Sequence, residues 1–177
     1  VEDTTAAVED TTVAGETTTA AEETTAAPAA APATAEEIVA YYNDAVNKAY
    51  AAKVGKPIFI DFTGHGCVNC REMEARVWAD PTVQQILRDE YVIVALYTDD
   101  KMKLDESHWV KTDSGKTLKT LGEINANYAL TRFGVNAQPY YVLQGKNGEV
   151  LGEPRGYDLS VEKFVDFLKK GVEEYKK

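Results

Sequence analysis

The sequence predicts one α/β domain with a central mixed β-sheet flanked by helices. Short apolar runs alternate with segments of helical periodicity, and a pair of cysteines follows shortly after one of these runs. The chain has 177 residues, of which 44% are hydrophobic and 10% aromatic. This is enough to bury a single core, so a second full domain is not expected.

Residues 1–33 consist mainly of Thr, Ala, Glu and Pro, and a Val-Glu-Asp-Thr-Thr sequence occurs twice within them. Because large apolar side chains are almost absent, this segment cannot offset the entropy of an ordered chain. We therefore expect a disordered acidic linker over residues 1–33 and a folded domain over residues 34–177. A tether is the functional interpretation of the linker, and a solvated tail without function is the alternative.

The formal net charge of -10 comes mostly from the amino-terminal segment. Of 29 acidic residues, nine lie in residues 1–37, which contain no Lys or Arg, and this leaves 20 acids against 19 bases in the remainder. A nearly neutral domain has no basic field to hold phosphate groups. We therefore expect no nucleic acid partner and no binding to an anionic membrane surface, and we expect a monomer.

The first predicted elements are a helix and a strand. Residues 34–37, Thr-Ala-Glu-Glu, match a capping box, and apolar residues at helical spacing then predict a helix to about Ala52. Residues 55–57, Gly-Lys-Pro, interrupt this pattern. Residues 58–62 are apolar on both faces except for one acid, which predicts a buried, central strand that runs parallel to a neighbour.

A helix and a second strand follow. Residues 63–66 turn the chain, and helical spacing over residues 67–79 places the cysteines at the start of a helix. Asp80 is a helix cap followed by proline, which predicts a short helix over residues 81–88. Residues 91–97 form a second apolar strand, so this part of the chain is a βαβ unit with a right-handed crossover.

The carboxyl-terminal half completes the order of elements. Residues 98–120 are polar and irregular, which predicts a long insertion, and residues 121–133 predict a helix that Gly134 ends. A last helix begins at about Ser160. Between these helices we expect a β-hairpin with strands at residues 140–144 and 149–152. The order α, β, α, β, α, β, β, α matches the thioredoxin fold, with an N-terminal helix and a long insertion.

Cys67 and Cys70 are the only cysteines, and their spacing indicates a local use rather than a disulfide scaffold. Cys67 lies at the first turn of a helix, where free N–H groups and the helix dipole stabilise a thiolate, so we predict that it is an exposed nucleophile. Cys70 lies within disulfide reach and is predicted to be more buried and to resolve the mixed disulfide. The alternatives are an inert disulfide, or half of a zinc site that His65 and His108 would complete.

Residues 56–74, which include Asp-Phe-Thr-Gly-His-Gly-Cys-Val-Asn-Cys, resemble the C-terminal periplasmic domains of the DsbD family of thiol:disulfide interchange proteins. Residues 136–141, Asn-Ala-Gln-Pro-Tyr-Tyr, share this resemblance, which extends over about residues 36–175. It implies a protein-disulfide reductase of the periplasm, tethered to the inner membrane, that passes electrons from a membrane-embedded donor domain to disulfide-bearing proteins. It implies no cofactor besides the redox-active disulfide.

Two carboxyl groups are candidates for tuning the dithiol. Asp61 lies on the buried strand, where an ionised carboxylate is costly, so its pKa should be raised. Glu74 lies four residues after Cys70 and on the same helical face as both cysteines. Carboxyls near the dithiol disfavour the thiolate and can shuttle the proton of Cys70, and the family resemblance assigns this role to both. A solvated helix position is the alternative for Glu74.

The family resemblance also implies substrate-binding residues. A cis peptide bond between Gln138 and Pro139, opposite the cysteines, would leave the backbone of Gln138 free to pair with an extended substrate. A trans proline that starts an edge strand is the alternative. The other predicted substrate-binding residues adjoin the cysteines: His65, Gly66, Val68 and Asn69. An exposed turn histidine without a function is the alternative for His65.

Two further functions stay open at this point. A dithiol oxidase or isomerase can have the same fold and the same cysteine spacing. A binding module without catalytic turnover would present the proline groove alone.

Overall fold

The computed structural model describes residues 46–177. The predicted linker and the predicted start of the amino-terminal helix lie outside the described residues. Helix α2 (Val46–Val54) confirms a helix at the end of the predicted range and ends two residues after the predicted position. Among the described helices, none combines the length and the apolar character that crossing a membrane requires.

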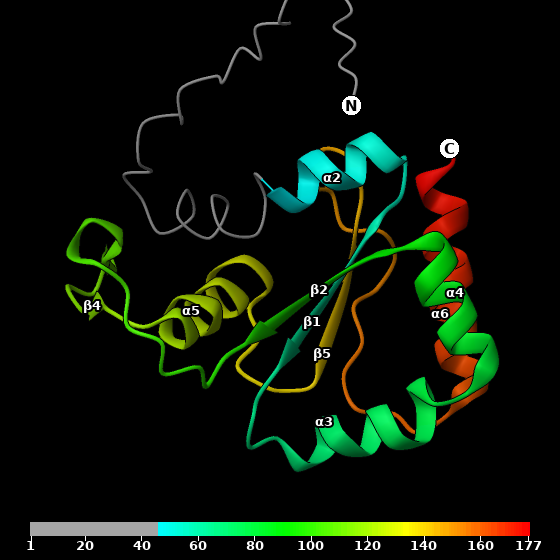
Figure 1. Ribbon diagram of the computed structural model, residues 1–177, viewed down its shortest axis with the longest axis horizontal. Coiled ribbons are helices and arrows are strands. Elements are labelled where there is room, and N and C mark those ends of the chain that lie inside the picture. Colours follow the sequence, from blue (N-terminus) through cyan, green and yellow to red (C-terminus); the bar gives the residue numbers. More distant parts are fainter. Residues whose placement is uncertain (1–45) are drawn as a thin grey trace, which may run out of the picture.

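The main sheet has three strands, with β1 (Ile58–Thr63) in the centre. β2 (Val92–Tyr97) pairs with β1 in parallel, and β5 (Tyr140–Gln144) pairs with it antiparallel on the other side (Figure 1). Every residue of β1 is buried. This confirms the predicted central strand with a parallel neighbour, and the sheet is mixed as expected.

One of the outer strands differs from the prediction. The predicted apolar strand over residues 91–97 is confirmed as β2, which lies at one edge of the sheet and leaves Ile93 46% exposed. The predicted partner strand of β5, residues 149–152, forms only an isolated bridge between Gln144 and Val150. Gly152, the last residue of this arm, adopts a positive φ angle, which departs from extended geometry. The prediction of a regular second hairpin strand was therefore wrong.

Helices cover both faces of the sheet (Figure 1). One buried cluster joins Phe59 to α3 (Val68–Met73), α4 (Pro81–Glu90) and α6 (Val161–Tyr175). The other joins Ile60 and Phe62 to α2 and α5 (Leu121–Phe133). Because successive strand residues point to opposite faces, Asp61 faces the side of Phe59 and therefore the side of α3.

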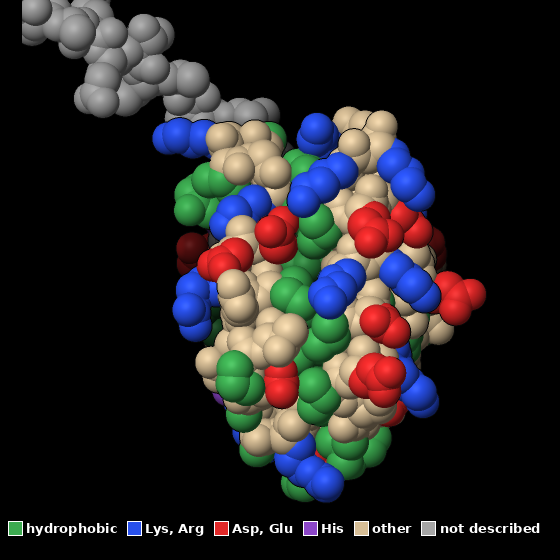
Figure 2. All heavy atoms as spheres, turned by 90° about the vertical axis from the view of Figure 1, so that its right-hand side faces the viewer, with side chains coloured by type: hydrophobic (Ala, Val, Ile, Leu, Met, Phe, Trp, Pro, Cys, Tyr) green, Lys and Arg blue, Asp and Glu red, His purple; other side chains and the backbone are tan. Residues whose placement is uncertain are grey.

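The caps of three helices agree with the sequence prediction. The Asp80 carboxylate accepts hydrogen bonds from the first turn of α4, Ser160 caps α6, and Gly134 ends α5 in the left-handed conformation. On the outer side of α4 and α6, basic and acidic side chains are interspersed around a strip of hydrophobic ones (Figure 2). This surface agrees with the nearly balanced charge of the domain.

The predicted helix over residues 67–79 is not regular. α3 passes into a π-helical turn, η2 (Glu74–Trp78), in which the N–H of Ala79 donates to the carbonyl of Glu74 five residues before it. Such turns widen a helix locally and are frequent at functional sites. The change from α-helical to π-helical geometry therefore begins at Glu74, one of the two carboxyl groups that are candidates for tuning the dithiol.

The insertion over residues 98–120 has its own structure. It contains a short 3-10 turn, η3 (Glu106–His108), and an antiparallel pair, β3 (Val110–Lys111) and β4 (Thr117–Leu118). The buried side chains of Val110, Leu118 and Ile124 form a small separate core beneath it. The segment is therefore an ordered extension of the domain rather than an irregular loop.

Candidate active site

The two cysteines lie where β1 leads into α3. Cys67 is the N-cap residue of α3, and Cys70 lies in its first turn. Their sulfur atoms form a disulfide with an S–S distance of 2.03 Å, and their Cα atoms are 5.2 Å apart. The N–H of Cys70 also donates to the Cys67 sulfur at 3.1 Å. The structure thus describes the oxidised dithiol and confirms that the pair lies within disulfide reach.

The exposure of the pair differs from the prediction. Cys70 is the more buried residue, as expected, but Cys67 is only 8% exposed and is not an open nucleophile in the oxidised form. Its side chain turns back to cap α3, where the N–H of Cys70 binds it. The exposed surface beside the disulfide belongs instead to Val68, which is 78% exposed, and to Asn69.

Asp61 is a buried carboxyl group on the α3 side of the sheet. It is 4% exposed, and its Oδ1 atom has no hydrogen-bond partner within residues 46–177. The pKa of Asp61 is raised to about 7, mainly by burial and further by the negative charge of Glu74, while the Arg71 guanidinium partly offsets these two effects. The predicted raised pKa is confirmed, and the group can change its protonation state near neutral pH.

Glu74 lies at the start of η2 and is neither buried nor fully solvated. Its Oε2 atom is 2.7 Å from Nη1 of Arg71. The other terminal nitrogen of Arg71 donates to the carbonyl oxygen of Gly64 at 3.3 Å. Arg71 was missed in the sequence, although its position directly after Cys70 and three residues before Glu74 was a usable signal. The arginine connects the helix of the dithiol to the turn before it.

The peptide bond between Gln138 and Pro139 is cis, as predicted. Pro139 is buried and Gln138 is half-buried. The side-chain oxygen of Gln138 accepts a short hydrogen bond from the Thr98 hydroxyl. A Cβ atom added to Gly64 would lie 2.8 Å from Nε2 of Gln138, so the Gln138 side chain packs on the turn before the cysteines.

His65 and Gly66 are exposed in that turn. The His65 ring stacks on Tyr97 with a centroid distance of 4.2 Å, and its Nε2 atom is 3.7 Å from a carboxylate oxygen of Asp100. The backbone N–H groups of both turn residues donate to the carboxylate of Asp99. Sequence reasoning missed Asp99, whose only signal was an acid two residues after the end of a strand.

Comparison with known proteins identifies the family. A family model described as a thioredoxin-like domain matches residues 44–171. The chain belongs to the thioredoxin-like family. Two solved structures share the fold of this thioredoxin-like domain. DsbH oxidoreductase superposes with a TM-score of 0.53 and 16% identity over 72% of this chain and 79% of that one. A thioredoxin from Thermus thermophilus superposes with a TM-score of 0.52 and 20% identity over 73% and 84%, respectively.

The sequence similarity to curated proteins is shorter. The thiol:disulfide interchange protein DsbD of Salmonella typhi is 42% identical over 55 residues, which are 31% of this chain. The match spans only 10% of the length of that relative. The thioredoxin-like domain is thus related to DsbD in part of its sequence, over a shorter stretch than the resemblance of residues 36–175 implied.

This arrangement determines which chemistry the thioredoxin-like domain supports. A Cys-x-x-Cys disulfide at a helix start, in a member of this family, supports thiol:disulfide oxidoreductase activity in general. Both sulfur atoms are engaged in the disulfide, and within the described residues no group of three or more His, Cys, Asp or Glu side chains is arranged to hold a metal ion. The reactive group of the site is the disulfide itself.

Proposed function

We propose that this thioredoxin-like domain is a protein-disulfide reductase. It takes electrons from a membrane-embedded donor domain and passes them to disulfide-bearing proteins of the periplasm. The observation that carries the proposal is the Cys67–Cys70 disulfide at the start of α3, on the sheet face that also holds the buried carboxyl of Asp61.

The charges around the site favour a reductant over an oxidant. A dithiol is strongly oxidising when its reduced form is stabilised, most often by a stabilised thiolate. Here the Asp99 carboxylate binds the turn before α3, Glu74 lies at the other end of this short helix, and Asp61 is buried on the α3 side of the sheet, where Arg71 is the cation that acts on it. Negative charge near Cys67 destabilises its thiolate, and this lowers the reduction potential of the pair.

The exchange proceeds in two steps. The Cys67 thiolate attacks one sulfur of the substrate disulfide, a mixed disulfide forms, and the departing substrate sulfur takes up a proton. Cys70 then loses its proton and attacks the Cys67 sulfur, which releases the second substrate thiol and forms the Cys67–Cys70 disulfide. Two electrons and two protons pass to the substrate. A donor dithiol restores the reduced domain by the reverse exchange.

Asp61 fits the proton transfer of the second step. Its pKa of about 7 lets it hold or release a proton at neutral pH. The residues that would contact the substrate are the exposed Val68 and Asn69, the turn residues His65 and Gly66, and the backbone of Gln138. The cis peptide bond before Pro139 supports pairing of this backbone with an extended substrate segment.

The periplasmic setting rests on the partial similarity to the thiol:disulfide interchange protein DsbD. The acidic segment over residues 1–33 would be the tether to the donor. Disulfide-bearing proteins of an oxidising compartment are the substrates that such a reductase meets.

A trapping experiment tests the proposal. The Cys70→Ala variant of the full chain, reduced and mixed with oxidised periplasmic extract, should accumulate mixed disulfides that a thiol reductant releases. The Cys67→Ala/Cys70→Ala variant is the matched control and should trap nothing. If the Cys70→Ala variant also traps nothing, the domain is a binding module without turnover. A reduction potential well above about -180 mV would instead favour an oxidase or isomerase.

A further inference from the structure

The segment that leaves β2 contacts three parts of the site that are remote in sequence. The N–H of Thr98 donates to the carbonyl of Thr63 at 2.9 Å, which ties this segment to the end of β1. The Thr98 hydroxyl contacts the side chain of Gln138, the residue before the cis proline. Asp99 then reaches the turn that leads into Cys67. Two adjacent residues thus join the strand, the turn and the proline segment.

Asp99 binds the turn through both carboxylate oxygens. Its Oδ1 atom accepts the N–H of His65 at 2.8 Å, and its Oδ2 atom accepts the N–H of Gly66 at 2.9 Å. These two hydrogen bonds, that of Gly66 first, hold the pKa of Asp99 below its usual value. The Asp99 carboxylate is therefore ionised at neutral pH. One of the two residues whose N–H groups it binds, Gly66, directly precedes Cys67.

The backbone N–H groups of His65, Gly66 and Cys67 all have hydrogen-bond acceptors. The N–H of Cys67 donates to the carbonyl of Gly64 at 3.2 Å, and the two preceding N–H groups are bound to Asp99. The N–H of Cys70, at 3.1 Å, is the donor that reaches the Cys67 sulfur. A helix start commonly offers several free N–H groups to a thiolate. Here the N–H groups of His65 and Gly66, in the turn before the helix, donate to the Asp99 carboxylate instead.

We propose that Asp99 is a positioning residue of the dithiol, whose carboxylate holds the turn that carries Cys67 and keeps the N–H groups of His65 and Gly66 from the Cys67 thiolate. The inference rests on the proposed exchange chemistry at Cys67. The Asp99 carboxylate withholds two N–H donors from the Cys67 sulfur and adds a negative charge to the turn next to Cys67. Both effects destabilise the thiolate and keep the reduced domain a strong donor of electrons.

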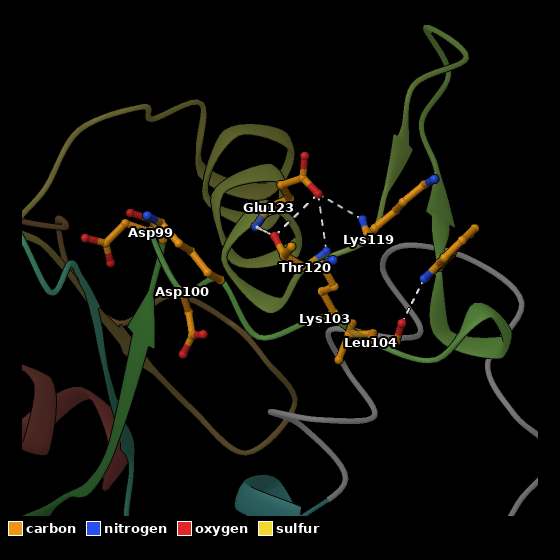
Figure 3. Close-up of a pocket in the computed structure, with 10 residues that line it drawn as sticks. Asp99, Asp100, Lys103, Leu104, Lys119, Thr120 and Glu123 are labelled. Atoms are coloured by element: carbon orange, nitrogen blue, oxygen red, sulfur yellow. Dashed lines mark hydrogen bonds between the residues drawn. The ribbon is translucent and has the colours of Figure 1, made fainter.

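The neighbouring residue offers a matched control. Asp99 and Asp100 both line one side of a cavity of about 630 Å³ that the insertion forms, whereas Lys119, Thr120 and Glu123 lie on the other side (Figure 3). Asp100 accepts the N–H of Met102 at 2.8 Å, and its other carboxylate oxygen faces the His65 ring. It carries the same charge as Asp99 and adjoins the same turn residue, but it binds no N–H group of the turn.

The test uses the reduced full chain and three variants, Asp99→Asn, Asp99→Ala and Asp100→Asn. The pH dependence of the alkylation rate reports the Cys67 thiol pKa, and hydrogen exchange reports the amides of His65 and Gly66. Both Asp99 variants should lower the Cys67 pKa by about one unit, which is about tenfold in the thiolate equilibrium. In Asp99→Ala the two amides should also exchange at least about tenfold faster, as expected for lost hydrogen bonds. The Asp100→Asn variant should change neither property.

Three outcomes would overturn the inference. The first is an unchanged alkylation profile in both Asp99 variants, even if the amides exchange faster, because Asp99 would then have a structural role alone. The second is unchanged hydrogen exchange of the His65 and Gly66 amides in Asp99→Ala, because their hydrogen bonds to Asp99 would then not exist in solution. The third is an Asp100→Asn variant with the same change in the Cys67 pKa. These measurements need no substrate, so trapping can fail while they succeed, and the proposed function and the Asp99 role are tested separately.

Discussion

The guanidinium of Arg71 and the carboxylate of Glu74 form an ion pair at 2.7 Å on the helix that carries the dithiol. The same guanidinium reaches the carbonyl of Gly64 and lowers the pKa of the buried Asp61, whereas Glu74 raises it. The pair therefore places opposing charges next to one buried carboxyl. The charge balance around the dithiol depends on these three side chains together.

Removal of Arg71 should raise the pKa of Asp61 above its value of about 7, because the opposing charge is lost while Glu74 remains. Carboxyl NMR titration of the oxidised Arg71→Gln variant measures this directly. Arg76→Gln is the matched control, since Arg76 pairs with Glu72 at 2.8 Å and does not act on Asp61. A shift of equal size in both variants would show that the effect is not local to the ion pair.

The variant Asp61→Asn/Glu74→Gln should lower the pKa of the Cys67 thiol, because two groups that oppose its thiolate become neutral. We expect a decrease of about one unit, measured by the pH dependence of alkylation in the reduced domain. Glu72→Gln removes a carboxylate from the same helix, where Glu72 binds Arg76 and Tyr157, and serves as the control. An unchanged titration in the double variant would remove both acids from the mechanism.

The stability of the oxidised domain should fall as the pH rises through the titration of Asp61. Its pKa is about 7 in the folded protein and 3.8 in the reference state, so the folded protein binds the proton more tightly between these values. Relative to Asp61→Asn, the free energy of unfolding of the wild type should decrease by up to about 4 kcal/mol from pH 4 to pH 8. Urea unfolding at several pH values measures this difference, and parallel profiles for the two proteins would contradict it.

Gly64 should tolerate substitution less well than Gly66. A Cβ atom at Gly64 would lie 2.8 Å from Nε2 of Gln138 and 3.1 Å from Oδ2 of Asp99, whereas at Gly66 the nearest contact, again with Asp99, is 3.7 Å. We expect Gly64→Ala to cost about 1–3 kcal/mol of stability by overpacking and Gly66→Ala to cost little. Thermal unfolding of the two variants measures the difference. Equal stability of the variants would show that the Gln138 and Asp99 side chains can move aside at no cost.

Local signals in the sequence were sufficient for three helix ends and for the dithiol. Asp80, Ser160 and Gly134 act on the helix ends beside them, so their roles follow from the residue type and its immediate neighbours. The spacing of Cys67 and Cys70 likewise places the two residues within disulfide reach across one helical turn. The raised pKa of Asp61 could be predicted because one acid interrupts an apolar strand.

Tertiary structure alone decided the contacts between distant segments. Asp99 binds the turn 33 and 34 residues before it, and Gln138 meets Thr98 at a separation of 40 residues. Such contacts depend on how the strand ends come together, and no local pattern records them. The low exposure of Cys67 was mispredicted for the same reason, because the position of a residue in a helix does not determine how much of its side chain the rest of the fold covers. The sequence by itself therefore determined the reactive pair, and the tertiary structure decided which charges and hydrogen bonds surround it.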